Sequence, residues 1–166
     1  MTVVKRISFS ATLIGLLLVS AGCRQEPSRW EAAQKATEGK KTSVSQDAVD
    51  GSIFNQFFPP QGDGYDIVFK QEKSGFAQAA LEQNGKEIAV FSVFDTASDP
   101  DAKTKFAEST EQVDGYPVVI EEKSLSALVG DRYQVQVRST DPAFGKSMRA
   151  EWLTKFNLKR IAEIEN

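Results

Sequence analysis

Residues 76–94 read FAQAALEQNGKEIAVFSVF, and this stretch decides the fold. Two largely apolar runs flank Asn84-Gly85, a pair that readily adopts the positive φ angles of a two-residue type I′ hairpin turn. A hairpin closed by this turn would place Leu81 opposite Ile88. The second run is apolar on both of its faces, which is typical of a strand in the interior of a sheet.

Outward from this hairpin, alternating and apolar runs predict more strands, over residues 66–72, 116–120, 124–129 and 133–138. Gly130-Asp131 predicts a second two-residue hairpin turn. Asp99-Pro100 and Asp141-Pro142 each combine an N-cap aspartate with a proline suited to the first helical position. The second pair precedes an amphipathic pattern with apolar residues at i, i+4 and i+8: Phe144, Met148 and Trp152. The expected fold is α+β, an antiparallel sheet of about six strands with two main helices packed on one face.

The two halves of this pattern look alike. Gly64-Tyr65 recurs as Gly115-Tyr116, and Glu72-Lys73-Ser74 recurs as Glu122-Lys123-Ser124. Each half then runs through strands into an Asp-Pro pair. We hypothesise a duplicated β-β-β-α unit, with chance recurrence of turn residues as the alternative.

The N-terminus has the parts of an export signal: Lys5-Arg6, an apolar run over residues 7–19, and small residues before Cys23. That run is shorter than the roughly 20 apolar residues that span a bilayer. Ser20-Ala21-Gly22-Cys23 resembles the bacterial lipobox, although leucine is commoner than serine at the first position. The resemblance implies that Cys23 carries acyl chains such as palmitate and becomes the mature N-terminus. An ordinary signal peptide with a chance cysteine is the alternative.

These features divide the chain into three parts. Residues 1–22 are the predicted lipoprotein signal peptide. Residues 23–61 hold the lipidated cysteine, a short helix and a linker, and residues 62–166 form a single α+β domain. Before Pro59-Pro60, three phenylalanines cluster: Phe54, Phe57 and Phe58. They either pack on the domain or form a partner-binding patch, because such a cluster is costly to leave exposed.

The composition excludes several kinds of catalytic, metal and binding site. The 166 residues include no histidine and one cysteine, so Ser-His-Asp triads and histidine zinc motifs are excluded. Lipidation of Cys23 would leave no thiol for a disulfide or a redox motif. The formal net charge is −3, and Lys5 and Arg6 leave with the signal. An acidic domain has no electrostatic basis for binding nucleic acid. No catalytic residue, cofactor or metal site is predicted.

Three groups of charged residues are candidate sites. Asp95, Asp99 and Asp101 lack the glycine and glutamate of a calcium-binding loop, and helix capping accounts for the last two. Glu121-Glu122 would point to opposite faces of a strand and so share no site. Arg132 and Arg138 flank a predicted strand and could receive an anionic ligand or partner, or simply solubilise the sheet.

The order of elements over residues 62–164 resembles the Mog1/PsbP-like α+β sandwich. The resemblance rests on Gly64-Tyr65, Asp99-Pro100, Gly130-Asp131-Arg132-Tyr133 and the helix with Trp152. The chain also resembles small lipoproteins of cyanobacteria, which implies no function. We expect a membrane-tethered, non-enzymatic binding or accessory module on the periplasmic or extracytoplasmic side, with the outer membrane as one location. The alternatives are an extrinsic subunit of a photosynthetic membrane complex, which the PsbP-like layout implies, and a carboxylate- or serine-dependent hydrolase.

Overall fold

The computed structural model describes residues 48–164, so Cys23, the signal peptide and the helix predicted near it lie outside the described residues. A 3₁₀ helix, η1 (Gly51–Phe57), is followed by the elements β1 (Tyr65–Lys73), β2 (Phe76–Gln83), β3 (Lys86–Asp95), η2 (Thr96–Ser98), η3 (Pro100–Phe106), β4 (Glu111–Val113), β5 (Tyr116–Ile120), β6 (Ser124–Val129), β7 (Tyr133–Ser139), α2 (Lys146–Thr154) and α3 (Leu158–Ala162). Among residues 48–164, no helix is both long enough and apolar enough to cross a membrane.

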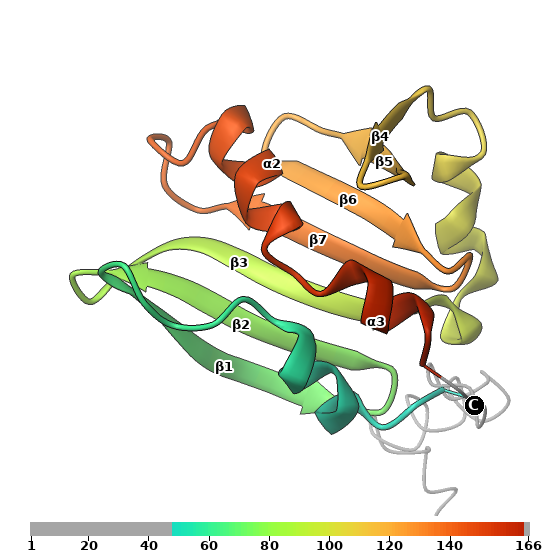
Figure 1. Ribbon diagram of the computed structural model, residues 1–166, viewed down its shortest axis with the longest axis horizontal. Coiled ribbons are helices and arrows are strands. Elements are labelled where there is room, and N and C mark those ends of the chain that lie inside the picture. Colours follow the sequence, from blue (N-terminus) through green and yellow to red (C-terminus); the bar gives the residue numbers. More distant parts are fainter. Residues whose placement is uncertain (1–47, 165–166) are drawn as a thin grey trace, which may run out of the picture. The chain divides into compact units, whose positions relative to one another are not determined.

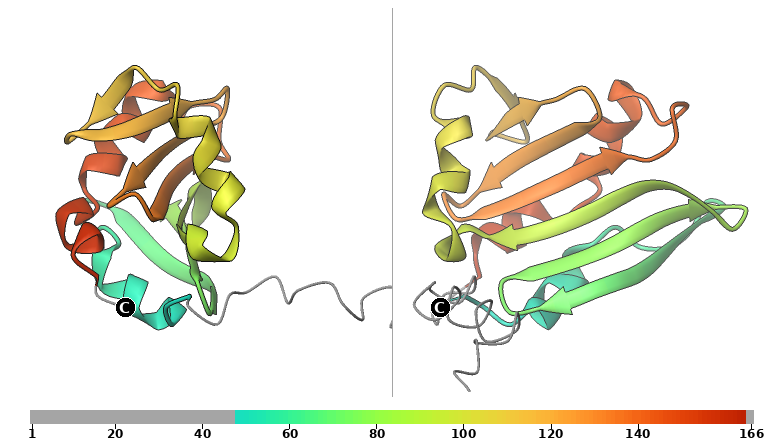
Figure 2. Two further views of the ribbon diagram at one scale, coloured as in Figure 1. Left: turned by 90° about the vertical axis from the view of Figure 1, so that its right-hand side faces the viewer. Right: turned by 180° about the vertical axis from the view of Figure 1, so that it is seen from behind.

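The strands form one antiparallel sheet in the order β1-β2-β3-β7-β6-β5-β4 (Figure 1). The α+β prediction is therefore confirmed, and β4 brings the sheet to seven strands where about six were expected. The helices α2 and α3 pack on one face, where the ring of Phe91 on β3 meets those of Trp152 and Phe156. η3, which forms at the first predicted helix start, lies on the other side of the sheet (Figure 2), so the helices predicted after Asp99-Pro100 and Asp141-Pro142 do not share one face. As predicted, β3 is an interior strand, between β2 and β7.

The Asn84-Gly85 turn has the predicted two residues, but the second connection has three, Gly130, Asp131 and Arg132, because Val129 pairs with Tyr133. One predicted register was also wrong. Asn84 and Gly85 have φ of 52° and 73°, and Gly130 and Asp131 have φ of 60° and 53°. Leu81 faces Ala89 rather than Ile88, because a β-bulge separates that pair from the Glu82–Glu87 pair. The bulge leaves Ile88 without a partner on β2. Bulges re-aim side chains locally, which matters for Ile88 below.

The two halves of the sheet occupy equivalent places. β1–β2–β3 and β5–β6–β7 are three-stranded meanders that meet at the β3–β7 pair. The turn Asp63-Gly64 precedes Tyr65 on β1, and Asp114-Gly115 precedes Tyr116 on β5, with positive φ at all four turn residues. The turns and strands of the proposed repeat therefore recur, but its helix does not, because the first half ends in the 3₁₀ helix η3 and the second in the α-helix α2.

η1 belongs to the packed body. Phe54, Phe57 and Phe58 are 0%, 4% and 7% exposed and lie in the main core cluster, so they are not a surface patch in this structure. Gly51 approaches the β1–β2 turn so closely that a Cβ would lie 2.2 Å from the Lys73 carbonyl oxygen. The packed body therefore includes η1, which lies before residue 62, where the domain was predicted to begin.

The C-terminal helix begins later than Asp141-Pro142 predicts. The Asp141 carboxylate accepts the Ala143 N–H and caps a turn instead, and Gly145 is the N-cap of α2. Phe144 therefore precedes the helix, although it is buried. Asp99-Pro100 does precede a helix, the 3₁₀ helix η3, with the proline in its first turn, but the Asp99 side chain makes no capping hydrogen bond, contrary to the prediction.

Candidate ligand-binding pockets beside the β7–α2 loop

The predicted site residues Arg132 and Arg138 do not come together. Arg132 precedes β7 and forms a two-pronged ion pair with Asp95, from Nε to Oδ1 at 2.8 Å and from Nη2 to Oδ2 at 2.7 Å. The same carboxylate accepts the backbone N–H groups of Ala97 and Val49. Arg138 is exposed on β7. Asp95 is thus a structural joint between the end of β3 and the β6–β7 turn.

The hydrogen bonds to Asp95 govern its ionisation. Burial of this fully enclosed carboxyl group disfavours its charged form. The hydrogen bonds from Arg132, Ala97 and Val49 outweigh that effect, and the net result is a lowered pKa. Asp95 is therefore ionised, and its carboxylate oxygens accept hydrogen bonds from groups of the same chain.

The remaining carboxylates considered from sequence lie apart. Asp99 and Asp101 are exposed at the start of η3. Glu121 accepts a hydrogen bond from the Ser124 hydroxyl. Within residues 48–164, no group of three acidic or cysteine side chains is arranged to hold a metal ion.

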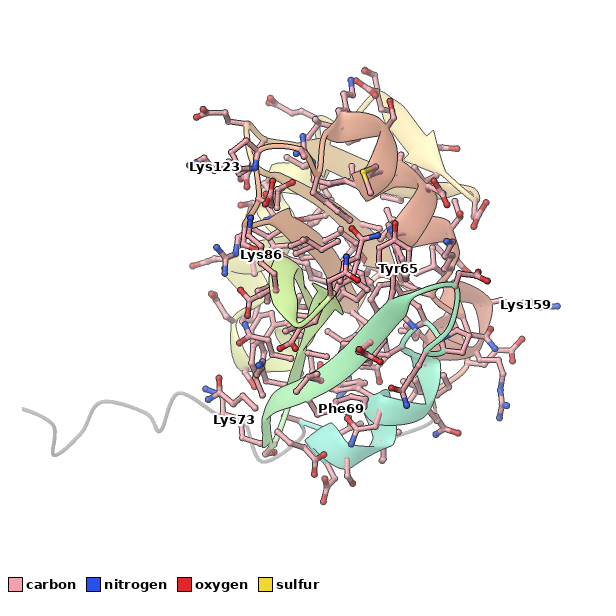
Figure 3. All side chains as sticks on the ribbon, turned by 90° about the vertical axis from the view of Figure 1, so that its left-hand side faces the viewer. Tyr65, Phe69, Lys73, Lys86, Lys123 and Lys159 are labelled. Atoms are coloured by element: carbon pink, nitrogen blue, oxygen red, sulfur yellow. The ribbon has the colours of Figure 1, made fainter. Side chains whose placement is uncertain are left out.

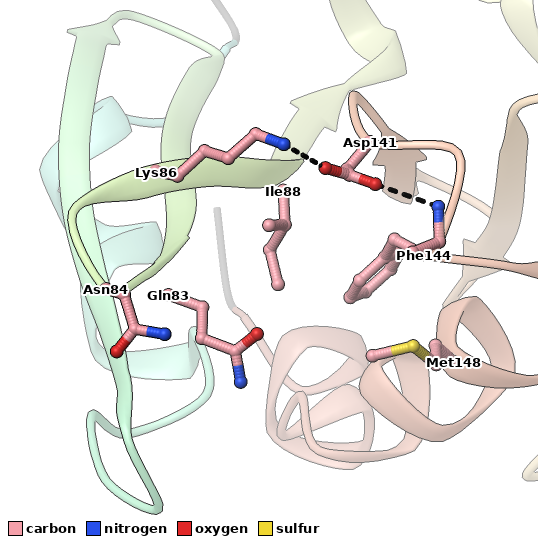
Figure 4. Close-up of a pocket in the computed structure, with 8 residues that line it drawn as sticks. Gln83, Asn84, Lys86, Ile88, Asp141, Phe144 and Met148 are labelled. Atoms are coloured by element: carbon pink, nitrogen blue, oxygen red, sulfur yellow. Dashed lines mark hydrogen bonds and ion pairs between the residues drawn. The ribbon is translucent and has the colours of Figure 1, made fainter.

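The largest pocket described, of about 520 Å³, opens between the β2–β3 turn and the β7–α2 loop (Figure 4). Ile88, Phe144 and Met148 form its apolar floor, and they point toward one another across it. The β-bulge leaves Ile88 unpaired with β2, and the Ile88 carbonyl instead accepts the N–H groups of Thr140 and Asp141. We call this the apolar pocket.

Polar groups line the rim of the apolar pocket. Gln83 ends β2, Asn84 follows it in the hairpin turn, and Lys86 pairs with Asp141 across the mouth. The Lys86 ammonium and the Ala143 N–H lower the pKa of the Asp141 carboxyl group. A few polar groups around an apolar floor are typical of ligand and side-chain binding pockets.

A second cavity, of about 350 Å³, lies on the other side of Asp141 and Phe144. Its wall includes Lys123, Lys146 and Arg149, and we call it the cationic pocket. Lys86 and Lys123 project outward on the same side of the molecule (Figure 3). Arg149 is only 6% exposed, although arginine is seldom enclosed without a paired acid.

Sequence reasoning missed both pockets. The sequence predicts a turn at Asn84-Gly85 and an apolar helix face with Phe144 and Met148. No local sequence pattern indicates that this turn and the β7–α2 loop lie side by side. Gly145-Lys146-Ser147 was the one available signal. It does not match a phosphate-binding loop, which needs another glycine five residues before its Gly-Lys-Ser, because Thr140 occupies that position.

Comparisons of this chain with protein-family models, with curated proteins and with solved structures give no match.

Proposed function

We propose that this protein is a membrane-tethered, non-enzymatic binding module of the cell envelope, and that it docks apolar side chains of a protein partner in the apolar pocket. The observation that carries the proposal is the apolar floor made by Ile88, Phe144 and Met148 at an open mouth. A volume of about 520 Å³ has room for one or two large apolar side chains. Buried apolar anchors of this kind commonly dominate the binding energy of protein interfaces.

The chemistry of the rim favours binding over catalysis. Asp141 is its acidic group, and the lowered pKa makes this carboxylate a weaker base than an ordinary aspartate. Lys86 is occupied by its ion pair with Asp141. A chain without histidine has few other groups that could exchange protons near neutral pH.

The tether part of the proposal rests on Cys23 and its lipobox-like context. Two or three acyl chains would give stable anchoring where one chain gives only reversible binding. The predicted linker would then join the anchor to the folded body. A binding module held this way would meet envelope partners at a high effective concentration.

Photo-crosslinking in cells tests the docking site. A photoreactive amino acid at Gln83, on the rim, should yield one reproducible protein adduct, whereas the same probe at the exposed Gln112 on β4 should not. Met148→Trp fills the pocket and should abolish the Gln83 adduct without changing membrane fractionation. An unchanged adduct in Met148→Trp, or the same adduct from both probe positions, would contradict the proposed docking site.

Cys23→Ser tests the tether separately. The variant should lose acyl labelling and its processing as a lipoprotein. If it retains the acyl label, Cys23 is not the lipidation site and the tether proposal fails.

A further inference from the structure

Arg149 is a buried cation without an anionic partner among residues 48–164. Its Nη1 donates to the Ser139 hydroxyl at 2.9 Å, and that hydroxyl in turn donates to the Phe144 carbonyl oxygen. The enclosed Nε has no hydrogen-bond partner. Of the enclosed side-chain polar atoms left without partners in this part of the chain, the others belong to Asn55 and Tyr133, so only Arg149 contributes a charged group.

Burying a charge without a counter-charge is costly, and proteins normally avoid it. Arg149 lines the cationic pocket, so an anion bound there would lie against this arginine. A ligand in this pocket would supply the acceptors that the fold itself does not.

The N-terminus of α2 opens at the same place. Gly145 is the N-cap and offers no side-chain acceptor to the first N–H groups of this nine-residue helix. Those groups have no acceptor within the helix, and the helix dipole favours an anion beside them. A Cβ at Gly145 would meet no protein atom, and its φ of −78° suits any residue, so nothing inside the protein requires glycine here.

The charges around the cavity favour an anion. Lys123, Lys146 and Arg149 stand against Glu122 and Asp141, and Asp141 is already paired with Lys86. Glu122 is exposed at the rim, where water screens its charge. Its carboxylate is the group expected to oppose binding.

We propose that the cationic pocket is a phosphate-binding site. The Arg149 guanidinium would donate to two phosphate oxygens, the first N–H groups of α2 would contact a third, and Lys146 and Lys123 would balance the charge at the mouth. The phosphate would come either from a soluble phosphate compound or from the headgroup of an anionic lipid. This proposal is independent of the docking site proposed above, because it rests on a different pocket.

Calorimetric titration of the full chain with inorganic phosphate tests the site, in one nonionic detergent and at constant ionic strength set with chloride. Binding should be saturable, and Arg149→Met should weaken it about tenfold or more, because hydrogen bonds to a charged group are lost. Arg160→Met removes the same side chain from the exposed surface of α3 and should leave the affinity unchanged.

Two further variants keep the test decisive if Arg149→Met folds poorly. Lys146→Gln should weaken phosphate binding about threefold, and Glu122→Gln should strengthen it by a similar factor, because each changes one exposed charge at the mouth. Both positions are exposed, so neither substitution disturbs the core.

Mixed micelles distinguish the two sources of phosphate. If phosphatidylglycerol in the micelles raises the melting temperature and phosphatidylcholine does not, and Arg149→Met removes the rise, the ligand is an anionic lipid headgroup. If inorganic phosphate binds and phosphatidylglycerol has no effect, the ligand is a soluble phosphate compound. If neither binds, or if Arg149→Met binds as tightly as the parent, the proposal is overturned.

Discussion

Two arginines near opposite ends of β7 differ in the partners that surround them. Arg132 precedes the strand, and both prongs of its guanidinium meet the enclosed Asp95 carboxylate. Arg149 reaches Ser139, at the end of the strand, and is more deeply buried than Arg132, yet its only hydrogen-bond acceptor within residues 48–164 is that hydroxyl. The fold supplies an anion for one arginine and leaves space for an anion beside the other.

This difference separates a structural role from a binding role. When a guanidinium is paired with a carboxylate whose other hydrogen bonds are also made, an external ion adds no stability. A buried guanidinium with an unpartnered Nε and a cavity beside it would be stabilised by any anion that fits. An arginine can therefore have a structural role or a binding role, depending on the groups that surround it.

The largest expected effect comes from breaking the matched pair. Arg132→Met leaves the Asp95 carboxylate buried and uncompensated, so it should lower the free energy of unfolding by about 3–5 kcal/mol at pH 7. Urea denaturation measures this loss. Lys105→Met, which removes an exposed cation from η3, is the control and should change stability by less than about 0.5 kcal/mol. A loss below about 1 kcal/mol for Arg132→Met would show that the pair is not a structural joint.

The unmatched arginine should behave in the opposite way. Arg149→Met replaces an unpaired buried charge with an apolar side chain of similar length, and the Ser139 hydroxyl keeps its bond to the Phe144 carbonyl. Without phosphate, stability should be unchanged or higher, by up to about 2 kcal/mol. Urea denaturation of Arg149→Met measures this change. If the free energy of unfolding falls as much as in Arg132→Met, Arg149 is a structural group like Arg132.

The smallest effect is the part of the acid dependence of stability that Asp95 contributes. Its pKa in the folded state is lowered, so its ionisation stabilises the fold above the unfolded value of about 3.9, and this contribution is lost as the pH falls through the folded value. The stability difference between the parent and Asp95→Asn should therefore shrink below about pH 4, by at most about 1.4 kcal/mol per pH unit. The acid slope of Arg149→Met should match that of the parent. A difference that stays constant down to pH 2 would argue against the lowered pKa.

Much of the fold could be predicted because its signals are local. Asn84-Gly85 and Gly130-Asp131 take up the positive φ angles that their residue types allow, and the alternation in 133–138 becomes β7. Local signals failed where the same few residues can form either of two local structures, a helix start or a capped turn. Asp141-Pro142 satisfies the rule for a helix start, but its carboxylate caps a turn and the helix begins after Gly145.

The sites were less predictable, because each depends on contacts between distant segments. The position of Arg132 beside a strand suggests an anion receptor, but its actual partner, Asp95, lies 37 residues away in the sequence. No local signal distinguishes Arg149, because an arginine on an amphipathic helix usually extends its charge into water. Only the packing of α2 against β6 and β7 encloses it.

The sequence by itself determined the antiparallel hairpins and the α+β class, because turn conformations and strand alternation depend on neighbouring residues. It also carries the basis for the predicted tether at Cys23, which depends on a short contiguous segment. Only the tertiary structure decided which charges are matched. The electrostatic environment of a side chain depends on every segment packed around it, and here packing gave Arg132 a carboxylate and gave Arg149 an open pocket.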